Sequence, residues 1–452
     1  MNPIGVTILS LLILVVLGAP RRWAGLGMVA GVLFLTQVQA INVGGLNMFA
    51  IRFLELAAFI RVMARREFSF GRLNKIDSAL LLVYGFTTIV FCLRSSDGQA
   101  GAIGIAVDAF LCYFSFRGLI GDMEDLRWFL RAFIFLLAPY ALLVVMESRT
   151  GHNPFVVLGG MEAGSRWTRH DRPRCFGSFR QPDTLGMFAA SFIPLYIGMA
   201  CMARERKRAL LAICICLIIA WAANSGGPAS AVVTGLACWG MWRFRTEMRK
   251  MRWGIVATFT ALALVMKAPV WYIFAHISNI TGGDGWHRSY LIDVAYQHLG
   301  KWWFAGMPYL DTEDWFPYHM DVAAGADITN QYISFGVAAG LGAIALFILL
   351  LTRAFSNLGK ALTAVRSSSH RPSEDEFLLW GLGVMLVVHI VDWFGITYFD
   401  QMYVIWFMQL ATISSLSVSC AEGVRAGTNE MGISLGEEDS PEPELLFKKS
   451  ST

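Results

Sequence analysis

The sequence predicts an all-α protein that crosses a membrane many times. Of its 452 residues, 56% are hydrophobic and only 15% carry a charged side chain, whereas about 25% are charged in a typical soluble domain. Apolar runs of roughly 17–25 residues recur along the chain, and each is long enough to cross a hydrocarbon layer about 30 Å thick. This composition excludes a soluble globular protein.

About 12 or 13 of these apolar runs qualify as transmembrane helices. The first run precedes Arg21 and Arg22 and does not follow a basic segment, so we interpret it as a retained span and not as a signal peptide. The expected spans are 4–19, 24–40, 47–63, 77–93, 100–116, 128–146, 184–202, 209–223, 229–242, 253–274, 331–352, 377–393 and 400–419. Residues 1–420 are therefore expected to form one integral-membrane domain.

Lysine and arginine are distributed unevenly between the connecting loops. When the spans alternate in direction, one set of loops holds 23 of these residues and the other set holds nine. Because cytoplasmic loops are enriched in lysine and arginine, the first set is expected in the cytoplasm. The same orientation places residues 421–452, an acidic segment that contains proline, in the cytoplasm as a disordered tail.

Two long loops, about 148–183 and 275–330, lie outside the cytoplasm in this orientation. Apolar residues at helical spacing over residues 288–299 predict that part of the second loop is a helix along the membrane surface. The first loop holds six arginines against three acidic residues, although positive charge normally stays on the cytoplasmic side. A polyanionic substrate would explain this exception.

Three loop arginines are placed to bind a lipid pyrophosphate at the membrane surface: Arg174, Arg180 and Arg288. A guanidinium group keeps its charge at any working pH and donates two parallel hydrogen bonds to a phosphate. The alternative is that these arginines bind lipid headgroups or pair with Asp171 and Asp183.

Charged residues also occur inside the expected spans. Arg52 lies three residues before Glu55 on the same helix face, which favours a local ion pair. A charged group at this depth can also line a polar cavity that contacts substrate. Asp108, His389 and Asp392 are open to the same two interpretations, structural or functional.

Several residues of the second long loop could serve as a general base, because His, Asp and Glu can take a proton from an attacking hydroxyl. They are His287, His298, Asp311, Glu313, Asp314, His319 and Asp321. The spacing of His319 and Asp321 is a weak metal signal, since no further ligands and no CxxC pattern stand out. We expect no metal, no cofactor and no nucleic-acid partner.

Three segments, in a fixed order around the two loops, carry a family resemblance. ESRTGHNPF at 147–155 leads into RCFGSFRQPDTLGMFAASFIPL from Arg174. HRSYLIDVAYQHLGKWWFAGMP follows from His287, and TNQYISFGVAAGLGAIAL from Thr329. Together these segments resemble the O-antigen ligase and O-antigen polymerase superfamily of bacterial inner-membrane proteins. The resemblance covers Met1 to about Cys420.

The resemblance implies a metal-independent inverting glycosyltransferase at the periplasmic face of the inner membrane. Such an enzyme moves a glycan from undecaprenyl pyrophosphate to a sugar hydroxyl, in exopolysaccharide, O-antigen or lipopolysaccharide synthesis. Arg174 and Arg288 are then expected to hold the pyrophosphate, and Arg180, Tyr332 and Arg52 are further candidate substrate contacts. The acceptor is another glycan in a polymerase and the lipid A core in a ligase. Other polysaccharide export proteins are candidate partners.

Two positions depart from the family pattern. Thr329 stands where ligases have a histidine, and threonine cannot act as a base near neutral pH. The catalytic candidates are therefore Asp327 and His319, with Asn330 beside them, and the missing histidine favours a polymerase over a ligase. Asp183 replaces the asparagine that closes the first segment. A lipid-linked-glycan flippase and a non-catalytic assembly partner are the alternatives from other classes.

Overall fold

The computed structural model describes residues 1–43, 46–162, 168–169, 171–273, 285–317, 325–367 and 372–437. The structure is 77% helical. Strands in the described part of the chain form two short antiparallel hairpins, β1 (Ala40–Val43) with β2 (Leu46–Phe49) and β3 (Thr168–Arg169) with β4 (Arg172–Pro173). The predicted all-α class is confirmed.

Each expected span overlaps a helix of the structure. These helices are α1 (Pro3–Gly18), α2 (Arg21–Phe34), α3 (Ala50–Ala64), α4 (Lys75–Arg94), α5 (Gln99–Leu119), α6 (Met123–Thr150), α7 (Pro182–Ala200), α8 (Arg206–Ala222), α9 (Gly226–Gly240), α10 (Met248–Val265), α14 (Gln331–Ser367), α15 (Glu374–Asp392) and α16 (Met402–Glu437). Among the residues described, six helices are long and apolar enough to cross a membrane: α4, α5, α6, α7, α14 and the Met402–Cys420 part of α16. The length and composition of these helices are compatible with a membrane-embedded helical bundle.

Local signals explain where several of these helices begin and end. α4 begins at a capping box, in which Asn74 accepts hydrogen bonds from the first turn and Asp77 binds the N–H of Asn74. α7 begins with Pro182, whose fixed φ suits a first helical position. α6 ends at Gly151, which adopts the left-handed conformation with φ of +74°.

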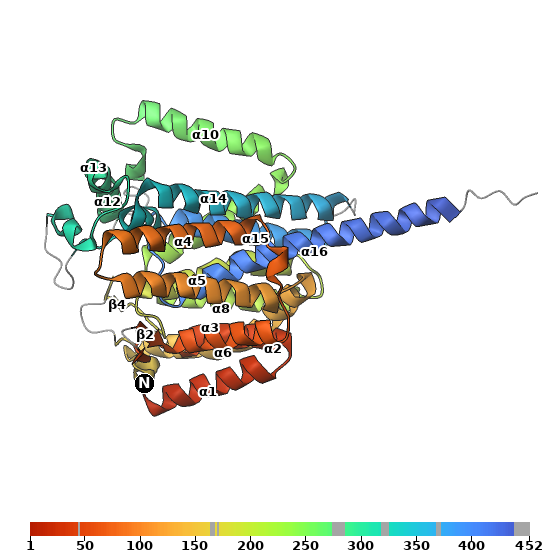
Figure 1. The fold of residues 1–452 in the computed structure, drawn as a ribbon, viewed down its shortest axis with the longest axis horizontal. Helices are drawn as coiled ribbons and strands as arrows, with labels where there is room; N and C mark the ends of the chain where they lie inside the picture. The colour runs from red at the N-terminus through yellow and green to blue at the C-terminus, as the bar shows by residue number, and fades with distance from the viewer. Residues whose placement is uncertain are drawn as a thin grey trace, which may run out of the picture.

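The helices lie side by side along the long direction of the molecule (Figure 1). The described parts of the two long loops gather at one end, on the left in Figure 1, which we name the loop end. They contain α12 (Gly285–Gln297) and α13 (Leu299–Trp302), which confirms the helix expected in the second loop. The remaining short helical turns are η1 (Phe70–Arg72), η2 (Pro154–Leu158), η3 (Met241–Phe244), η4 (Val270–Tyr272) and η5 (Tyr309–Trp315).

The loops richest in lysine and arginine meet at the opposite end, which we name the basic end. Ion pairs join them to one another: Arg22 to Asp125 at 2.8 Å, Arg131 to Glu205 at 2.9 Å and Arg245 to Glu376 at 3.2 Å. Because these pairs connect loops far apart in the sequence, they tie the ends of the bundle helices together.

α14 is broken at Gly340, which has φ of +79°. The break frees backbone groups on both sides, and the loop after α13 pairs with them. The N–H of Met307 donates to the carbonyl of Val337 at 2.9 Å, and the N–H of Leu341 donates to the carbonyl of Trp303 at 2.7 Å. The second long loop is therefore anchored inside a membrane helix and does not merely lie on the bundle.

Arg94, at the end of α4, reinforces this anchor. Its guanidinium donates hydrogen bonds to the carbonyls of Ala305, Val337 and Ala338 at 2.9, 3.0 and 3.2 Å. The last residue of α4 therefore meets the first part of α14, so the two helices run antiparallel.

The last helix differs from expectation in its length. α16 continues to Glu437, so residues 421–437 are helical although we expected disorder from residue 421. The first proline of this segment is Pro441, and without an earlier proline the backbone hydrogen bonds of the helix can continue. Figure 1 shows the extension projecting beyond the bundle at the basic end. Residues 438–452 lie outside the described residues.

Candidate active site at the loop end

A cavity of about 210 Å³ lies at the loop end between four segments of the chain. Its walls come from the start of α7, the first turns of α9, the start of α12, and the end of α15 with the turn that follows. The charged side chains in these walls are Asp183, Arg288 and Asp392. The cavity thus brings together residues that are far apart in the sequence.

Arg288 supplies the positive charge of the wall. It lies in the first turn of α12, where neighbouring His287 stacks on Phe316 with 4.3 Å between the ring centroids. Its guanidinium packs closely on Gly395: a Cβ atom at Gly395 would lie 2.9 Å from Nε and 3.0 Å from Cζ of Arg288. The absence of a side chain at Gly395 therefore makes room for the guanidinium beside the cavity.

Arg174 is connected to the cavity through Asp183. The two residues form an ion pair, and Asp183 also lines the cavity. Burial lowers the pKa of the Arg174 guanidinium, Asp183 raises it, and the positive charges of Arg169 and Arg288 lower it further. The positive charges of Arg174 and Arg288 are therefore close enough to repel each other. Asp183 pairs with Arg174 and also lines the cavity that contains Arg288.

The start of α9 provides a second feature that favours an anion. Ser225, the N-cap residue, makes no side-chain hydrogen bond to the helix. The first N–H groups of a helix have no partner inside it, and the cavity is lined there by Gly226, Gly227 and Ser230. Because the backbone dipoles of a helix favour negative charge at its start, Arg288 and α9 together suit a phosphate group.

Asp392 also lines this cavity, and both of its carboxylate oxygens are buried beside it. Its side chain is 5% exposed, and neither carboxylate oxygen has a hydrogen-bond partner within the described part of the chain. The positive charge of Arg288 is close enough to attract the Asp392 carboxylate. A buried carboxylate without hydrogen bonds is unfavourable, so a hydrogen bond from a hydroxyl group that reaches it from the cavity would stabilise this one.

Asp327, a predicted catalytic residue, lies near the cavity but not in its wall. Nε2 of His287 lies 3.3 Å from the backbone carbonyl oxygen of Asp327. Burial raises the pKa of the Asp327 carboxyl, His287 lowers it, and the negative charge of Asp183 raises it. The Asp327 carboxylate is therefore close enough to Asp183 of the cavity wall for the two negative charges to repel each other.

Asn330 and Tyr332, also predicted site residues, hold the start of α14 against the end of α15. The side chain of Asn330 accepts hydrogen bonds from the N–H groups of Tyr332 and Ile333 at 3.0 and 3.1 Å. The Tyr332 hydroxyl donates to the carbonyl of Ile390 at 3.1 Å, and its ring packs on Phe394 with 4.8 Å between centroids. Both residues support the wall, since Phe394 lines the cavity and they do not.

Arg180 and Arg52 belong to a separate charged group at the loop end. Nε of Arg180 lies 3.0 Å from Oδ2 of Asp400. Burial raises the pKa of Asp400 to about 6, Arg180 lowers it, and Asp108 raises it. Arg52 donates two hydrogen bonds to Asp108 at 2.7 and 2.8 Å. The predicted local pair of Arg52 with Glu55 is therefore wrong, because Asp108 on α5 offers both carboxylate oxygens.

His319, a catalytic candidate, and Asp321 lie outside the described residues. In the ranges that the structure describes, no group of three or more His, Cys, Asp or Glu side chains could hold a metal ion. His389 is fully buried, and its Nδ1 shares a hydrogen bond with the hydroxyl of Tyr398. It lies one helical turn before Asp392 but is not in the cavity wall.

Sequence reasoning missed the first turn of α9. The expected span at 229–242 began after Gly226, Gly227 and Pro228, and no role was assigned to these residues. The signal that identifies the site is this same tripeptide, because glycine allows a ligand to approach the backbone and proline favours the first turn of a helix. The chain matches no protein-family model and no curated protein.

Proposed function

We propose that the protein is a polymerase-type glycosyltransferase that transfers a glycan from undecaprenyl pyrophosphate to a sugar hydroxyl of a growing polysaccharide. The observation that carries the proposal is the cavity in which Arg288, Asp183 and Asp392 meet the start of α9. It combines features suited to an anionic leaving group with a carboxylate suited to an acceptor hydroxyl. The resemblance to the O-antigen ligase and polymerase superfamily supports the same activity.

The proposed topology has 13 membrane crossings, with the loop end in the periplasm and the basic end in the cytoplasm of the bacterial inner membrane. The unequal distribution of lysine and arginine supports this orientation. The ion pairs that gather the basic loops at one end, such as Arg131 with Glu205, also support this orientation. The cavity would then open to lipid-linked glycans already on the periplasmic side.

In this mechanism Arg288 and the first N–H groups of α9 bind the donor pyrophosphate, and Arg174 adds a second positive charge. The acceptor oxygen attacks the anomeric carbon while the bond from that carbon to the pyrophosphate oxygen breaks. Negative charge grows on the leaving pyrophosphate, and fixed cations and helix dipoles stabilise this charge without rearrangement. Binding both substrates in one cavity also supplies the alignment that the displacement needs.

We assign the proton-accepting role to Asp392. It shares the cavity with Arg288, whereas the predicted candidate Asp327 lies outside the wall. Unsatisfied carboxylate oxygens can accept the hydrogen bond of the attacking hydroxyl and then its proton. Asp183 is less suited to this role, because it is paired with Arg174.

Asp392→Asn is expected to lower the turnover of glycan transfer by roughly 10²- to 10⁴-fold, because the amide cannot accept the proton. Asp327→Asn is the matched comparison and should retain turnover within about tenfold of the unmodified protein. Turnover would be measured as chain elongation by purified, monodisperse variants. Full activity of Asp392→Asn together with an inactive Asp327→Asn would transfer the role to Asp327.

The function itself is tested with purified protein and an undecaprenyl-pyrophosphate-linked repeat unit. We expect a ladder of longer lipid-linked glycans and release of undecaprenyl pyrophosphate, both measured by gel electrophoresis and mass spectrometry. Failure of the folded protein to extend the repeat unit would refute the polymerase. Movement of the intact substrate across proteoliposomes without extension would indicate a flippase.

The polysaccharide of a deletion strain separates polymerase from ligase. A lost polymerase leaves single repeat units attached to lipid A or exported as such. A lost ligase leaves full-length chains on the carrier lipid. We expect the first result, because Thr329 stands where ligases have a histidine.

A further inference from the structure

A second cavity, of about 630 Å³, lies at the basic end between α4, α14 and α16. Its wall contains three basic side chains, Lys75, Arg353 and Lys360. Within the described ranges, none of the three has a carboxylate partner within 4.0 Å. Other basic residues at this end are paired, as Arg131 is with Glu205 and Arg245 with Glu376. The cavity therefore holds positive charge that the neighbouring described residues do not neutralise.

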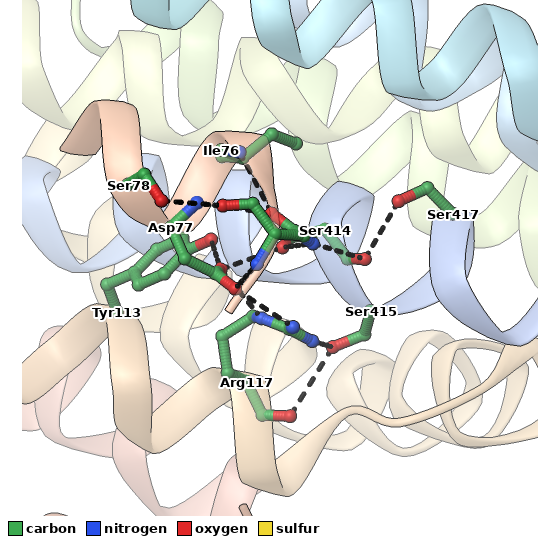
Figure 2. Close-up of polar contacts among 9 residues, drawn as sticks. Ile76, Asp77, Ser78, Tyr113, Arg117, Ser414, Ser415 and Ser417 are labelled. Carbon is green, nitrogen blue, oxygen red and sulfur yellow. Dashed lines mark hydrogen bonds and ion pairs between the residues drawn. The ribbon is translucent and has the colours of Figure 1, made fainter. Parts of the chain in front are cut away.

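Asp77, the acidic residue beside this wall, takes part in a buried hydrogen-bond network. Figure 2 shows Asp77 of α4, next to Ser78 of the cavity wall, bound by Arg117 and Tyr113 of α5 and by Ser414 of α16. Nε of Arg117 and Oγ of Ser414 each lie 3.0 Å from Oδ1 of Asp77, which is fully buried. The carboxylate thus balances Arg117 behind the wall and leaves the cavity cations without a counter-ion.

Asn357 adds a neutral hydrogen-bond donor to the cations. Its residue is only 7% exposed, yet it lines the cavity. No hydrogen bond holds its side-chain amide in the part of the chain that the structure describes. A nearly buried amide is normally paired, so this one is placed to bind a group that enters the cavity.

The cavity is basic at one end and apolar at the other. Along α14, Leu349, Arg353 and Lys360 lie on one stripe, and along α4 the wall runs from Lys75 to Leu82. Because α4 and α14 run antiparallel, the two leucines lie together on the side nearer the middle of the bundle. Leu82 is 50% exposed, and exposed leucine on a membrane helix faces lipid. A phosphate at the basic side and an acyl chain along the leucines would match this gradient.

We propose that this cavity binds the phosphate of an anionic phospholipid, with the first part of an acyl chain against Leu82 and Leu349. Basic pockets between membrane helices on the cytoplasmic side are suited to such headgroups. The volume is in the range of pockets that enclose small ligands. The site lies at the opposite end of the bundle from the proposed active site, so it stands independently of the glycosyltransferase assignment.

Native mass spectrometry of the purified full chain in detergent tests the site, with dioleoyl phosphatidylglycerol and dioleoyl phosphatidylcholine as probes. We expect one tightly bound phosphatidylglycerol molecule and weaker binding of phosphatidylcholine. The double variant Arg353→Gln with Lys360→Gln should weaken phosphatidylglycerol binding about tenfold or more and leave phosphatidylcholine unchanged, since each nearby cation contributes to binding an anionic lipid. Lys207→Gln, an exposed lysine at the same end, is the control and should bind as the unmodified protein does.

Asn357→Asp provides a second variant. Aspartate has nearly the same side-chain volume as asparagine but adds a negative charge that repels an anionic lipid. It should remain monodisperse, because three cations surround the new carboxylate, and should lose phosphatidylglycerol to a similar degree. Equal binding of the two lipids by the unmodified protein would overturn the proposal, as would unchanged binding in both variants. Inorganic phosphate at 100-fold excess, roughly enough to compete at a simple anion site, should not displace the lipid; displacement would show a phosphate site instead of a lipid site.

Discussion

Arg288→Ala is expected to lower the rate of glycan transfer by roughly 10²- to 10³-fold, the usual effect of removing one group that stabilises developing negative charge. Arg288 is the only cation in the described wall of the cavity, and its guanidinium packs closely against Gly395. Because charge on the pyrophosphate grows during the displacement, the turnover number should fall and the Michaelis constant for the lipid-linked donor should change less. The measurement is the elongation rate of purified variants over a range of donor concentrations.

Arg288→Lys tests whether geometry matters as well as charge. Lysine keeps the positive charge but cannot donate two parallel hydrogen bonds, so we expect activity between those of Arg288→Ala and the unmodified protein. Arg149→Ala is the control, because Arg149 is an exposed arginine in the last turn of α6 at the loop end and does not line the cavity. Unmodified activity in Arg288→Ala would remove the proposed donor site.

Gly340→Ala is expected to destabilise the fold by about 2–5 kcal/mol, from backbone strain together with overpacking. The residue has φ of +79°, and a Cβ atom there would lie 2.4 Å from the carbonyl oxygen of Phe304 and 2.8 Å from that of Trp303. These contacts are with backbone atoms that cannot rotate away. The variant should therefore separate the second long loop from α14 and disturb Arg288, which the same loop carries.

The measurements are the thermal midpoint in detergent and the rate of limited proteolysis near Trp303. Gly359→Ala is a matched control in the same helix, because no atom lies within 4 Å of its added Cβ. Alanine in a helix interior is favoured over glycine by about 1 kcal/mol, so this control should be equally or more stable. An unchanged midpoint in Gly340→Ala would show that the loop is not anchored at the break.

The positions of the long helices could be predicted because a membrane span is a local property. A run of about 20 apolar residues identifies it without reference to the rest of the fold. The break at Gly340 could not be found this way, since the apolar pattern continues through it as one expected span at 331–352. The break depends on backbone partners in the loop after α13, such as Trp303.

The candidate site was predictable only in part, for the same reason. Arg174 and Arg288 were identified from their own loops, but the meeting of Arg288 with Asp392 depends on how α12 packs against the end of α15. Arg52 illustrates the limit of local rules: spacing favoured Glu55, three residues away, and tertiary packing supplied Asp108 instead. Asn330 and Tyr332 have the right position in the sequence, yet their polar groups are engaged in holding helices together.

The ion pair between Arg174 and Asp183 means that the resting site carries its own counter-ion. A donor pyrophosphate that binds Arg174 must displace this carboxylate, so substrate capture in the proposed reaction is an exchange of anions. After glycan transfer, Asp183 competes for the same guanidinium against the spent carrier lipid. The carboxylate would thereby weaken retention of the product and help clear the site for the next cycle.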